Sequence, residues 1–202
     1  MKILINFYAN VSEHSANSLI NYITQQIASQ KTENLIDEIV IQVASSGGSS
    51  DHGLLIFNYL RQLSIPITTI GMGNVDSAAV MIFCAGKKRI AMKSCRILLH
   101  EALTNIQGSF NAVKLHEIAY MNERITHDYS SVIADVTDKD IAEFVEQVRE
   151  GKVLSSVEAK NFDLVTDISD APYLSNLDNL QILMINNPPV AGNQVQHNQV
   201  SN

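Results

Sequence analysis

The feature of this sequence that most limits its fold is a regular alternation of short apolar runs with segments of helical periodicity. A short apolar run between turn residues is typical of a buried strand, and apolar residues recurring every three or four positions are typical of an amphipathic helix. Strands that alternate with helices join through right-handed crossovers into a parallel sheet, so the sequence predicts an α/β fold. The predicted strands are 1–5, 38–44, 65–70 and 96–100, and the predicted helices between them are 13–30, 51–63 and 78–85.

Ser77 lies at a predicted turn between a strand and a helix, within the Gly-bearing segment Gly71–Val80. A serine hydroxyl at a helix N-terminus is close to backbone N–H groups that stabilise developing negative charge. An ordinary helix N-cap is the alternative role for such a serine. His100 ends the apolar run that starts at Arg96, as expected if a strand delivers an imidazole to the same edge of the sheet. A core histidine with satisfied hydrogen bonds is the alternative there.

A Gly-Gly turn, Ser45-Ser46-Gly47-Gly48, also joins a predicted strand to a predicted helix. Glycine permits a close approach of the backbone to a ligand, which would place an N–H beside a substrate carbonyl. Gly47, Gly73 and Ser77 are all predicted at carboxyl ends of parallel strands, where such sheets bind ligands. The sequence therefore predicts a single site at this edge.

These motifs, in this order, resemble those of ClpP, the proteolytic subunit of the Clp proteases, within the ClpP/crotonase superfamily. That family has a Ser-Pro-Gly-Gly loop, a Gly-x-Ala-Ala-Ser-Met turn around its nucleophile, and a histidine that ends Ser-Arg-Val-Met-Ile-His. The resemblance runs from about residue 3 to about residue 168. It implies a spiral of strand–helix units with a protruding handle helix. It also implies Ser77 as nucleophile, His100 as base, and an oxyanion hole made by the N–H groups of Gly48 and Ala78.

The third member of the catalytic triad departs from the family pattern. Gly151 stands where the family has the orienting aspartate. Glu150 is adjacent, but a shift of one residue on an extended segment turns a side chain to the opposite side. Asp138, Asp140 and Glu101 are further carboxylates that no motif supports. We expect the histidine to find a substitute acceptor: a backbone carbonyl, water, or a carboxylate from elsewhere. Because losing the orienting aspartate of a serine triad lowers turnover by about 10⁴-fold, we expect weak activity.

Other departures surround the predicted nucleophile. Ser46 replaces the loop proline, which we expect to loosen the backbone that holds Gly48. Asp76 precedes Ser77 and adds a negative charge that opposes a developing oxyanion if the two face each other. The segment after the histidine, 101–105, also differs from the family, so the peptide-binding strand is expected to begin differently.

Residues 110–136 form a long predicted helix with apolar residues at mixed three- and four-residue spacing. The resemblance implies that this helix is the handle that packs against a facing subunit, and we therefore expect a homo-oligomer. A long helix lying on its own sheet is the alternative.

The remaining C-terminal elements are two helices, 140–149 and 157–162, and an edge strand, 180–185. Ser155 with Glu158 predicts a capping box at the start of the second helix. We expect one domain over residues 1–186. Residues 187–202 are rich in Asn, Gln and Val after a Pro-Pro pair, and they are expected to be a disordered tail.

Charge and composition exclude several function classes. A net charge of −7 and a pI near 5.3, without a basic run, argue against nucleic-acid binding. The longest apolar run is too short to span a bilayer, and the first strand reaches a polar residue too early for a signal peptide, so we expect a cytoplasmic protein without membrane contact. Cys84 and Cys95 lack metal-ligand spacing and are predicted to be reduced core residues. Neither a metal nor a cofactor is expected.

Two function hypotheses follow. The first is a serine endopeptidase that uses Ser77 and His100 to cut peptides or unfolded proteins inside an oligomeric chamber. The alternative is a catalytically weak or inactive paralogue that acts as an assembly or regulatory subunit, which the glycine at position 151 favours. A crotonase-type acyl-CoA enzyme shares the two-N–H oxyanion hole, but such an enzyme has no use for a serine nucleophile. The sequence leaves open whether a Clp-type ATPase is a partner.

Overall fold

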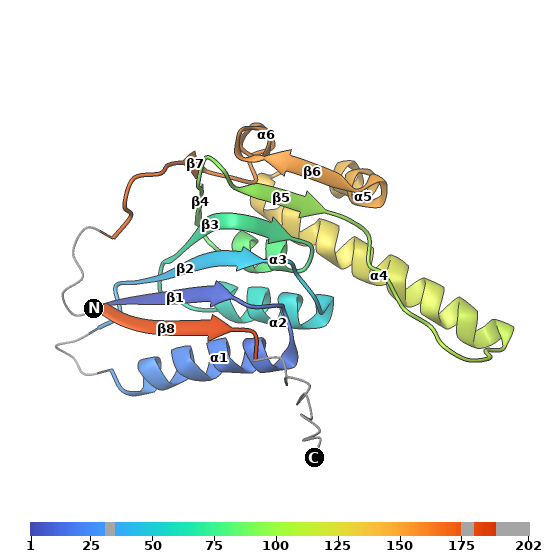
Figure 1. The fold of residues 1–202 in the computed structure, drawn as a ribbon, viewed down its shortest axis with the longest axis horizontal. Coiled ribbons are helices and arrows are strands. Elements are labelled where there is room, and N and C mark those ends of the chain that lie inside the picture. The colour runs from blue at the N-terminus through green and yellow to red at the C-terminus, as the bar shows by residue number, and fades with distance from the viewer. Residues whose placement is uncertain (31–34, 175–179, 189–202) are drawn as a thin grey trace, which may run out of the picture.

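In the described part of the chain, eight strands form one sheet with the order β6-β5-β3-β2-β1-β8, and β4 pairs with β3 and with the short β7 (Figure 1). The structure is a computed structural model that describes residues 1–30, 35–174 and 180–188. Neighbouring strands are parallel except β5 and β6, which are antiparallel. The strands are β1 (Lys2–Tyr8), β2 (Glu38–Ser45), β3 (Ile67–Asp76), β4 (Lys88–Ala91), β5 (Arg96–Leu99), β6 (Lys152–Ser155), β7 (Asp167–Ile168) and β8 (Leu180–Asn186).

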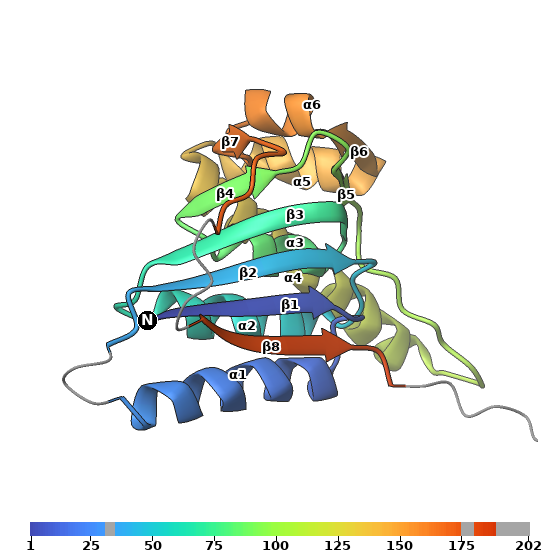
Figure 2. The same cartoon turned by 60° about the vertical axis from the view of Figure 1, so that its left-hand side comes forward.

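The helices α1 to α4 lie on one face of this sheet, and α5 and α6 lie near its β6 edge (Figures 1 and 2). Side-chain caps fix several of their starts. Ser12 and Ser15 form a capping box on α1, and Ser155 and Glu158 form the predicted one on α6. The helices are α1 (Glu13–Ala28), α2 (Ser50–Arg61), α3 (Ala79–Cys84), α4 (Ala112–Thr137), α5 (Ile141–Glu150) and α6 (Ser156–Asn161).

Side chains along the central strands point alternately to the two faces of the sheet, and an apolar layer lies on each face. The side chains that face the helices are fully buried, among them Ile5 and Phe7 of β1 and Ile41 of β2. This layer belongs to one core cluster that reaches from β1 to β8, which supports the predicted single domain over residues 1–186; that boundary stays a prediction. On the opposite face a smaller cluster is covered by Tyr173 and Leu174.

The predicted strand–helix order is confirmed, but the predicted end of the third strand is wrong. β3 continues to Asp76, so Gly71 and Gly73 lie within the strand instead of in a turn. The extension is possible because β3 changes partners along its length. It pairs with β4 as far as Gly71 and with β5 from Asn74 onward, so both parts have hydrogen-bonded neighbours.

Three short strands, β4, β6 and β7, were not predicted because two to four residues carry too little periodicity. The predicted edge strand is confirmed as β8, which pairs in parallel with β1. Of the predicted tail, residues 189–202 lie outside the described residues. None of the described helices is long and apolar enough to cross a membrane.

The helix α4 projects past the carboxyl ends of the strands (Figure 1). One face of its C-terminal half is buried, beginning at Thr126, whereas its first half keeps large apolar side chains in solvent. Val113 is 76% exposed and Tyr120 is 63% exposed. The predicted long helix is therefore confirmed, and its outer half has large apolar side chains that no other described residue buries.

The Arg89 side chain of β4 forms hydrogen bonds with three segments of the chain next to the core. This side chain is 7% exposed and donates to four backbone carbonyls: Leu164 O at 2.8 Å, Gly86 O at 3.0 Å, Val136 O at 2.9 Å and Asp163 O at 3.0 Å. The planar guanidinium suits this arrangement because it directs several donors in fixed directions. The fork joins the C-terminal turn of α4 to the segment after α6.

We predict that R89M lowers the free energy of unfolding by about 3 kcal/mol or more, because four backbone carbonyls, two of them in fully buried hydrogen bonds, lose their donors. Urea denaturation measures the effect. R61M is the matched control: Arg61 is half exposed and pairs with the exposed Asp135, so its loss should change stability by less than about 0.5 kcal/mol. Equal effects of the two substitutions would contradict the role given to Arg89.

Candidate active site

A pocket of about 370 Å³ lies at the carboxyl ends of the strands. Ser77, His100 and Gly48 line it together, although they come from the ends of β3, β5 and β2. Residues of α2, of the segment after β5, and of α4 complete its walls. The edge predicted from the sequence is therefore where these three residues meet.

Ser77 occupies a sharp turn between β3 and α3. Its φ of 56° is unusual for a residue with a side chain, and such strained positions recur at functional sites. Two backbone bonds hold the turn: the Ser77 N–H donates to Leu98 O at 2.8 Å, and its carbonyl accepts from Val80 N at 2.9 Å. The Ser77 hydroxyl makes no hydrogen bond with any described residue, so it is not acting as the N-cap of α3.

The Gly-Gly turn lies directly against the Ser77 turn. Gly47 and Gly48 have φ values of 84° and 140°, which glycine adopts readily. A Cβ added to Gly47 would lie 2.6 Å from Ser77 Cβ and 3.0 Å from Ala78 N, so no other residue fits there. The two turns can pack this closely only because Gly47 has no side chain.

The backbone N–H groups of Gly48 and Ala78 have no acceptor among the described residues. The two backbone hydrogen bonds to Val11 are made by Gly47 and Ser49, the residues on either side of Gly48. Val11 N donates to Gly47 O at 2.7 Å, and Ser49 N donates to Val11 O at 2.8 Å. Because Gly48 itself is exposed, its N–H is free to donate to a ligand in the pocket.

His100 is half buried, and its Nδ1 lies 2.7 Å from Glu101 O. A carbonyl oxygen can only accept, so Nδ1 carries the proton and Nε2 of the neutral ring is an acceptor. A backbone carbonyl is one of the substitutes expected for the missing aspartate. No hydrogen bond joins Ser77 Oγ to His100 Nε2 in the described part of the chain, although both residues line the pocket.

Gly151 lies across from His100. The antiparallel pairing of β5 with β6 places Leu99 opposite Lys152, and continuing this register by one residue brings His100 opposite Gly151. Gly151 has a φ of 72° and open space where a Cβ would stand. The register agrees with Gly151 as the residue at the family's aspartate position, and no side chain is available there to contact the imidazole.

The other carboxylates considered from the sequence have separate roles. Asp138 ends α4 with a φ of 54°, and Asp140 caps α5 by accepting from Ala142 N at 2.9 Å. Glu101 lies 4.0 Å from the Arg149 guanidinium. Glu150, the last residue of α5, is exposed. None of these carboxylates lines the pocket that holds Ser77.

The negative charge of Asp76, which was expected to oppose an oxyanion at Ser77, is paired with a cation. Its carboxylate is 5% exposed and is held by Arg96, with Nη2 to Oδ2 at 2.8 Å and Nε to Oδ1 at 3.4 Å. Asn74 Nδ2 donates to the same carboxylate at 3.3 Å and to Ser46 Oγ at 3.2 Å. The charge beside Ser77 is therefore compensated.

The same contacts change the expectation for Ser46. Its hydroxyl accepts a hydrogen bond from Asn74, and Asn74 also donates to Asp76, which forms the ion pair with Arg96. A side-chain hydrogen bond therefore restrains the loop in place of the family's proline ring, and the expected loosening is offset.

The two cysteines are free and buried, as predicted. Burial raises the pKa of Cys84 to about 12 and that of Cys95 to about 11, so both are thiols near neutral pH. Within residues 1–30, 35–174 and 180–188, no three His, Cys, Asp or Glu side chains gather in a way that could hold a metal ion.

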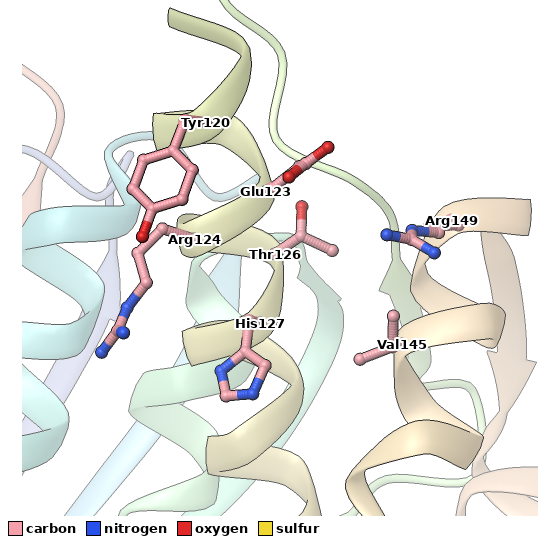
Figure 3. Close-up of a pocket in the computed structure, with 7 residues that line it drawn as sticks. All are labelled: Tyr120, Glu123, Arg124, Thr126, His127, Val145 and Arg149. Atoms are coloured by element: carbon pink, nitrogen blue, oxygen red, sulfur yellow. The ribbon is translucent and has the colours of Figure 1, made fainter. Parts of the chain in front are cut away.

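A second pocket, of about 310 Å³, lies between α4 and α5 (Figure 3). Thr126 and His127 of α4 and Val145 and Arg149 of α5 are among its lining residues. It contains none of the residues expected to do chemistry. Its location between two helices, away from the strand ends, separates it from the candidate site.

Sequence reasoning missed part of the pocket wall. Thr104 Oγ1 donates to Asn122 Oδ1 at 2.6 Å and thereby fastens the segment after β5 to α4. Asp51, in the first turn of α2, also lines the pocket. Its place three residues after the Gly-Gly turn was a usable signal, whereas the contact of Thr104 with Asn122 needed the tertiary structure.

The sheet order, the projecting α4 and the pocket at the strand ends define the ClpP-like class of α/β proteins. A point mutant of ClpP1 from Listeria monocytogenes has the same fold, with a TM-score of 0.72 over 83% of this chain and 91% of that one, at 19% identity. The Clp protease family model matches residues 2–172, and the chain belongs to that family.

Two curated relatives are described as ATP-dependent Clp protease proteolytic subunit 2. The one from Borreliella burgdorferi is 30% identical over 67% of this chain and 68% of its own length. The one from Treponema denticola is 29% identical over 73% of this chain and 74% of its own length. The family resemblance stated from the motifs is confirmed.

We predict that G48A loses most of its reactivity toward serine-directed reagents. A Cβ at Gly48 would lie 2.3 Å from Val11 O, and the backbone there has a positive φ, so the turn must move. The strain alone costs about 1–3 kcal/mol. The rate of labelling by a fluorophosphonate and the midpoint of thermal unfolding measure both effects.

G73A is the matched control, because a Cβ at Gly73 meets nothing within 4 Å and its φ is not positive. It should label at nearly the wild-type rate. If G48A labelled as fast as G73A, the Gly-Gly turn would have no role in the site.

Proposed function

We propose that this protein is a ClpP-like serine endopeptidase with a Ser77–His100 dyad. One observation carries the proposal: a serine in a strained turn, a histidine and Gly48, whose N–H has no acceptor among the described residues, line one pocket. The N–H of Ala78, the residue after Ser77, also has no acceptor among them. These are the nucleophile, the base and the oxyanion donors of an acyl-transfer site. The family membership supports the same reaction class.

The proposed reaction follows from the roles of these groups. Ser77 Oγ attacks the peptide carbonyl carbon while Nε2 of His100 accepts its proton, and the N–H groups of Gly48 and Ala78 donate to the oxyanion. The C–N bond then breaks as the imidazolium returns the proton to the leaving amine. Water, deprotonated by the same histidine, hydrolyses the acyl ester and releases Ser77.

The missing carboxylate limits this chemistry. Glu101 O supports the tautomer in which Nε2 accepts a proton, which is one of the tasks of a triad aspartate. A neutral carbonyl does not provide the full charge that stabilises the imidazolium in the transition state. We therefore propose slow turnover relative to a complete triad.

A second candidate function is an assembly or regulatory subunit with little or no catalysis. It is favoured by the glycine at position 151 and by the lack of a hydrogen bond between Ser77 and His100 among the described residues. In that case the pocket keeps its shape but its serine is not activated.

Assembly is part of both candidates. The exposed apolar half of α4 supports a homo-oligomer built through residues 110–136, and peptides or unfolded proteins would then be the substrates held inside its chamber. The relatives are subunits of ATP-dependent proteases by description, which makes a Clp-type ATPase a candidate partner. The cytoplasmic location is proposed from the sequence alone.

The test of the proposed function is labelling by a fluorophosphonate, which needs an activated serine but no turnover. Wild-type protein should be labelled on Ser77, found by mass spectrometry of the digested protein. S77A should not be labelled. S131A removes an exposed serine of α4 and should label like wild type. Absence of labelling in wild type would favour the subunit without catalysis.

The same labelling reaction tests whether Gly151 stands at the position of the orienting carboxylate. G151D should raise the labelling rate and peptide turnover by about tenfold or more, because a carboxylate opposite His100 stabilises the imidazolium. G151N is the matched control, since it carries the same strain at a φ of 72° without the charge. If both variants fold, G151D gains nothing and E150Q abolishes labelling, then Glu150 is the acid.

Assembly gives a further prediction. Sedimentation of the wild-type chain should show a species several times heavier than the 22.3 kDa chain. V113D with Y120D places two charges on the exposed half of α4 and should shift the protein toward monomer. V157D changes an equally exposed apolar residue of α6 and should leave the assembly intact. A wild-type monomer at micromolar concentration would refute the oligomer.

A further inference from the structure

A small cavity of about 20 Å³ lies next to the pocket that holds Ser77. Ser50, Asp51 and Ile125 line both spaces, which places the cavity directly beside the pocket. Met81 of α3 is a further apolar wall of the cavity, and Tyr129 of α4 also lines it. The wall that the two spaces share therefore carries a carboxylate, Asp51, beside the apolar side chain of Ile125.

Asp51 is a carboxylate without a partner at this junction. It makes no ion pair and no side-chain hydrogen bond with any described residue. Asp128, which also lines the cavity, differs because Arg124 Nε pairs with it at 3.0 Å. Asp51 is thus the carboxylate that a ligand can use.

The position of Asp51 beside the nucleophile is fixed by close helix packing. A Cβ on Gly53 would lie 2.9 Å from Ala78 O and 2.7 Å from Met81 Cε, so α2 contacts the start of α3 directly. Asp51 is two residues before Gly53 in the same helix. Its distance from the oxyanion donor Ala78 is therefore set by rigid elements.

Tyr129 provides a second, independent sign of a ligand. Its side chain is 5% exposed, and its hydroxyl is buried without a hydrogen-bond partner among the described residues. Burial raises the pKa of Tyr129 well above its ordinary value, so the group is a neutral phenol. Because an unpaired buried hydroxyl is costly, it is expected to meet a polar ligand atom or a water, and the cavity has room for one.

We propose that this pocket accepts a lysine or arginine side chain of the peptide substrate, on the N-terminal side of the cleaved bond, with Asp51 as its counter-ion. The inference rests on the proposed peptidase function. The aliphatic stem would pack on Ile125 and Met81, while the cationic end donates to Asp51 and, directly or through a water, to the Tyr129 oxygen. Lysine and arginine carry only donors at that end, which matches a carboxylate and a phenol oxygen.

Apolar and acidic substrate side chains fit this pocket less well than lysine or arginine. An apolar side chain of equal length gives the exposed Asp51 no counter-ion and leaves the buried Tyr129 hydroxyl without a partner, and an unpaired buried polar group allows a site to reject such a ligand. An acidic side chain meets Asp51 at short range and is repelled.

The experiment compares two peptidyl diphenyl phosphonates that differ only in the lysine ammonium group: one has a lysine side chain and the other has norleucine. Each inactivates a serine peptidase when Ser77 Oγ bonds to phosphorus and phenol leaves, so no turnover is required. We expect the lysine reagent to inactivate wild-type protein at least about fivefold faster at low salt, and the ratio to fall at high salt. In D51N the ratio should fall to about one.

The matched control is E13Q, which removes an exposed carboxylate from the first turn of α1, away from the pocket, and should keep the wild-type ratio. A wild-type ratio near one, or a ratio that D51N does not change, overturns the role of Asp51 while Ser77 still reacts and the peptidase proposal stands. Failure of both phosphonates and of a fluorophosphonate to react with Ser77 overturns both proposals. An equal fall in D51N and E13Q would show a general charge effect and also overturn this assignment.

Discussion

The site depends on one close contact, the packing of the Gly-Gly turn after β2 against the Ser77 turn after β3. Gly47 fits only because it lacks a side chain, and Ser77 holds a φ of 56° only because its N–H is bonded to Leu98 O and its carbonyl to Val80 N. The contact brings Gly48 to the pocket that Ser77 lines, and Ala78, the next residue after Ser77, packs against Gly47. Preorganised N–H donors stabilise an oxyanion without rearrangement during the reaction, so the packing of two turns underlies the proposed chemistry.

Two departures from the family pattern, Asp76 and Ser46, are compensated by local contacts. The third, Gly151, is compensated only in part. The buried Asp76 is paired with Arg96, and Asn74 joins that pair to Ser46, so the loop is held without its proline. At His100 the substitute is a neutral carbonyl, which orients the ring but adds no full charge. If His100 is the base that we propose, this carbonyl orients its ring but gives it less activation than an aspartate would.

Much of the fold follows from local sequence signals, because helices with apolar stripes and strands with buried runs are recognisable over a few residues. The capping box of Ser155 with Glu158 and the long helix α4 are examples. The end of β3 was mispredicted because its second half is stabilised by pairing with β5, a partner distant in sequence. For the same reason the contact of Asp76 with Arg96 was not foreseen: it depends on strand register, which the residues of either strand do not specify alone. Gly151 could be aligned from its neighbours, but its place opposite His100 follows from the pairing of β5 with β6.

The central claim is that Gly48 and Ala78 form an oxyanion hole for a reaction at Ser77. A crystal structure of the protein phosphonylated on Ser77 tests it most directly, because the phosphonyl oxygen takes the place of the oxyanion. The account predicts that this oxygen accepts hydrogen bonds from both N–H groups at about 2.7–3.1 Å, with Nε2 of His100 within reach of Ser77 Oγ. A phosphonyl oxygen that points to solvent, or a His100 ring turned away from Ser77 in the labelled protein, would contradict it.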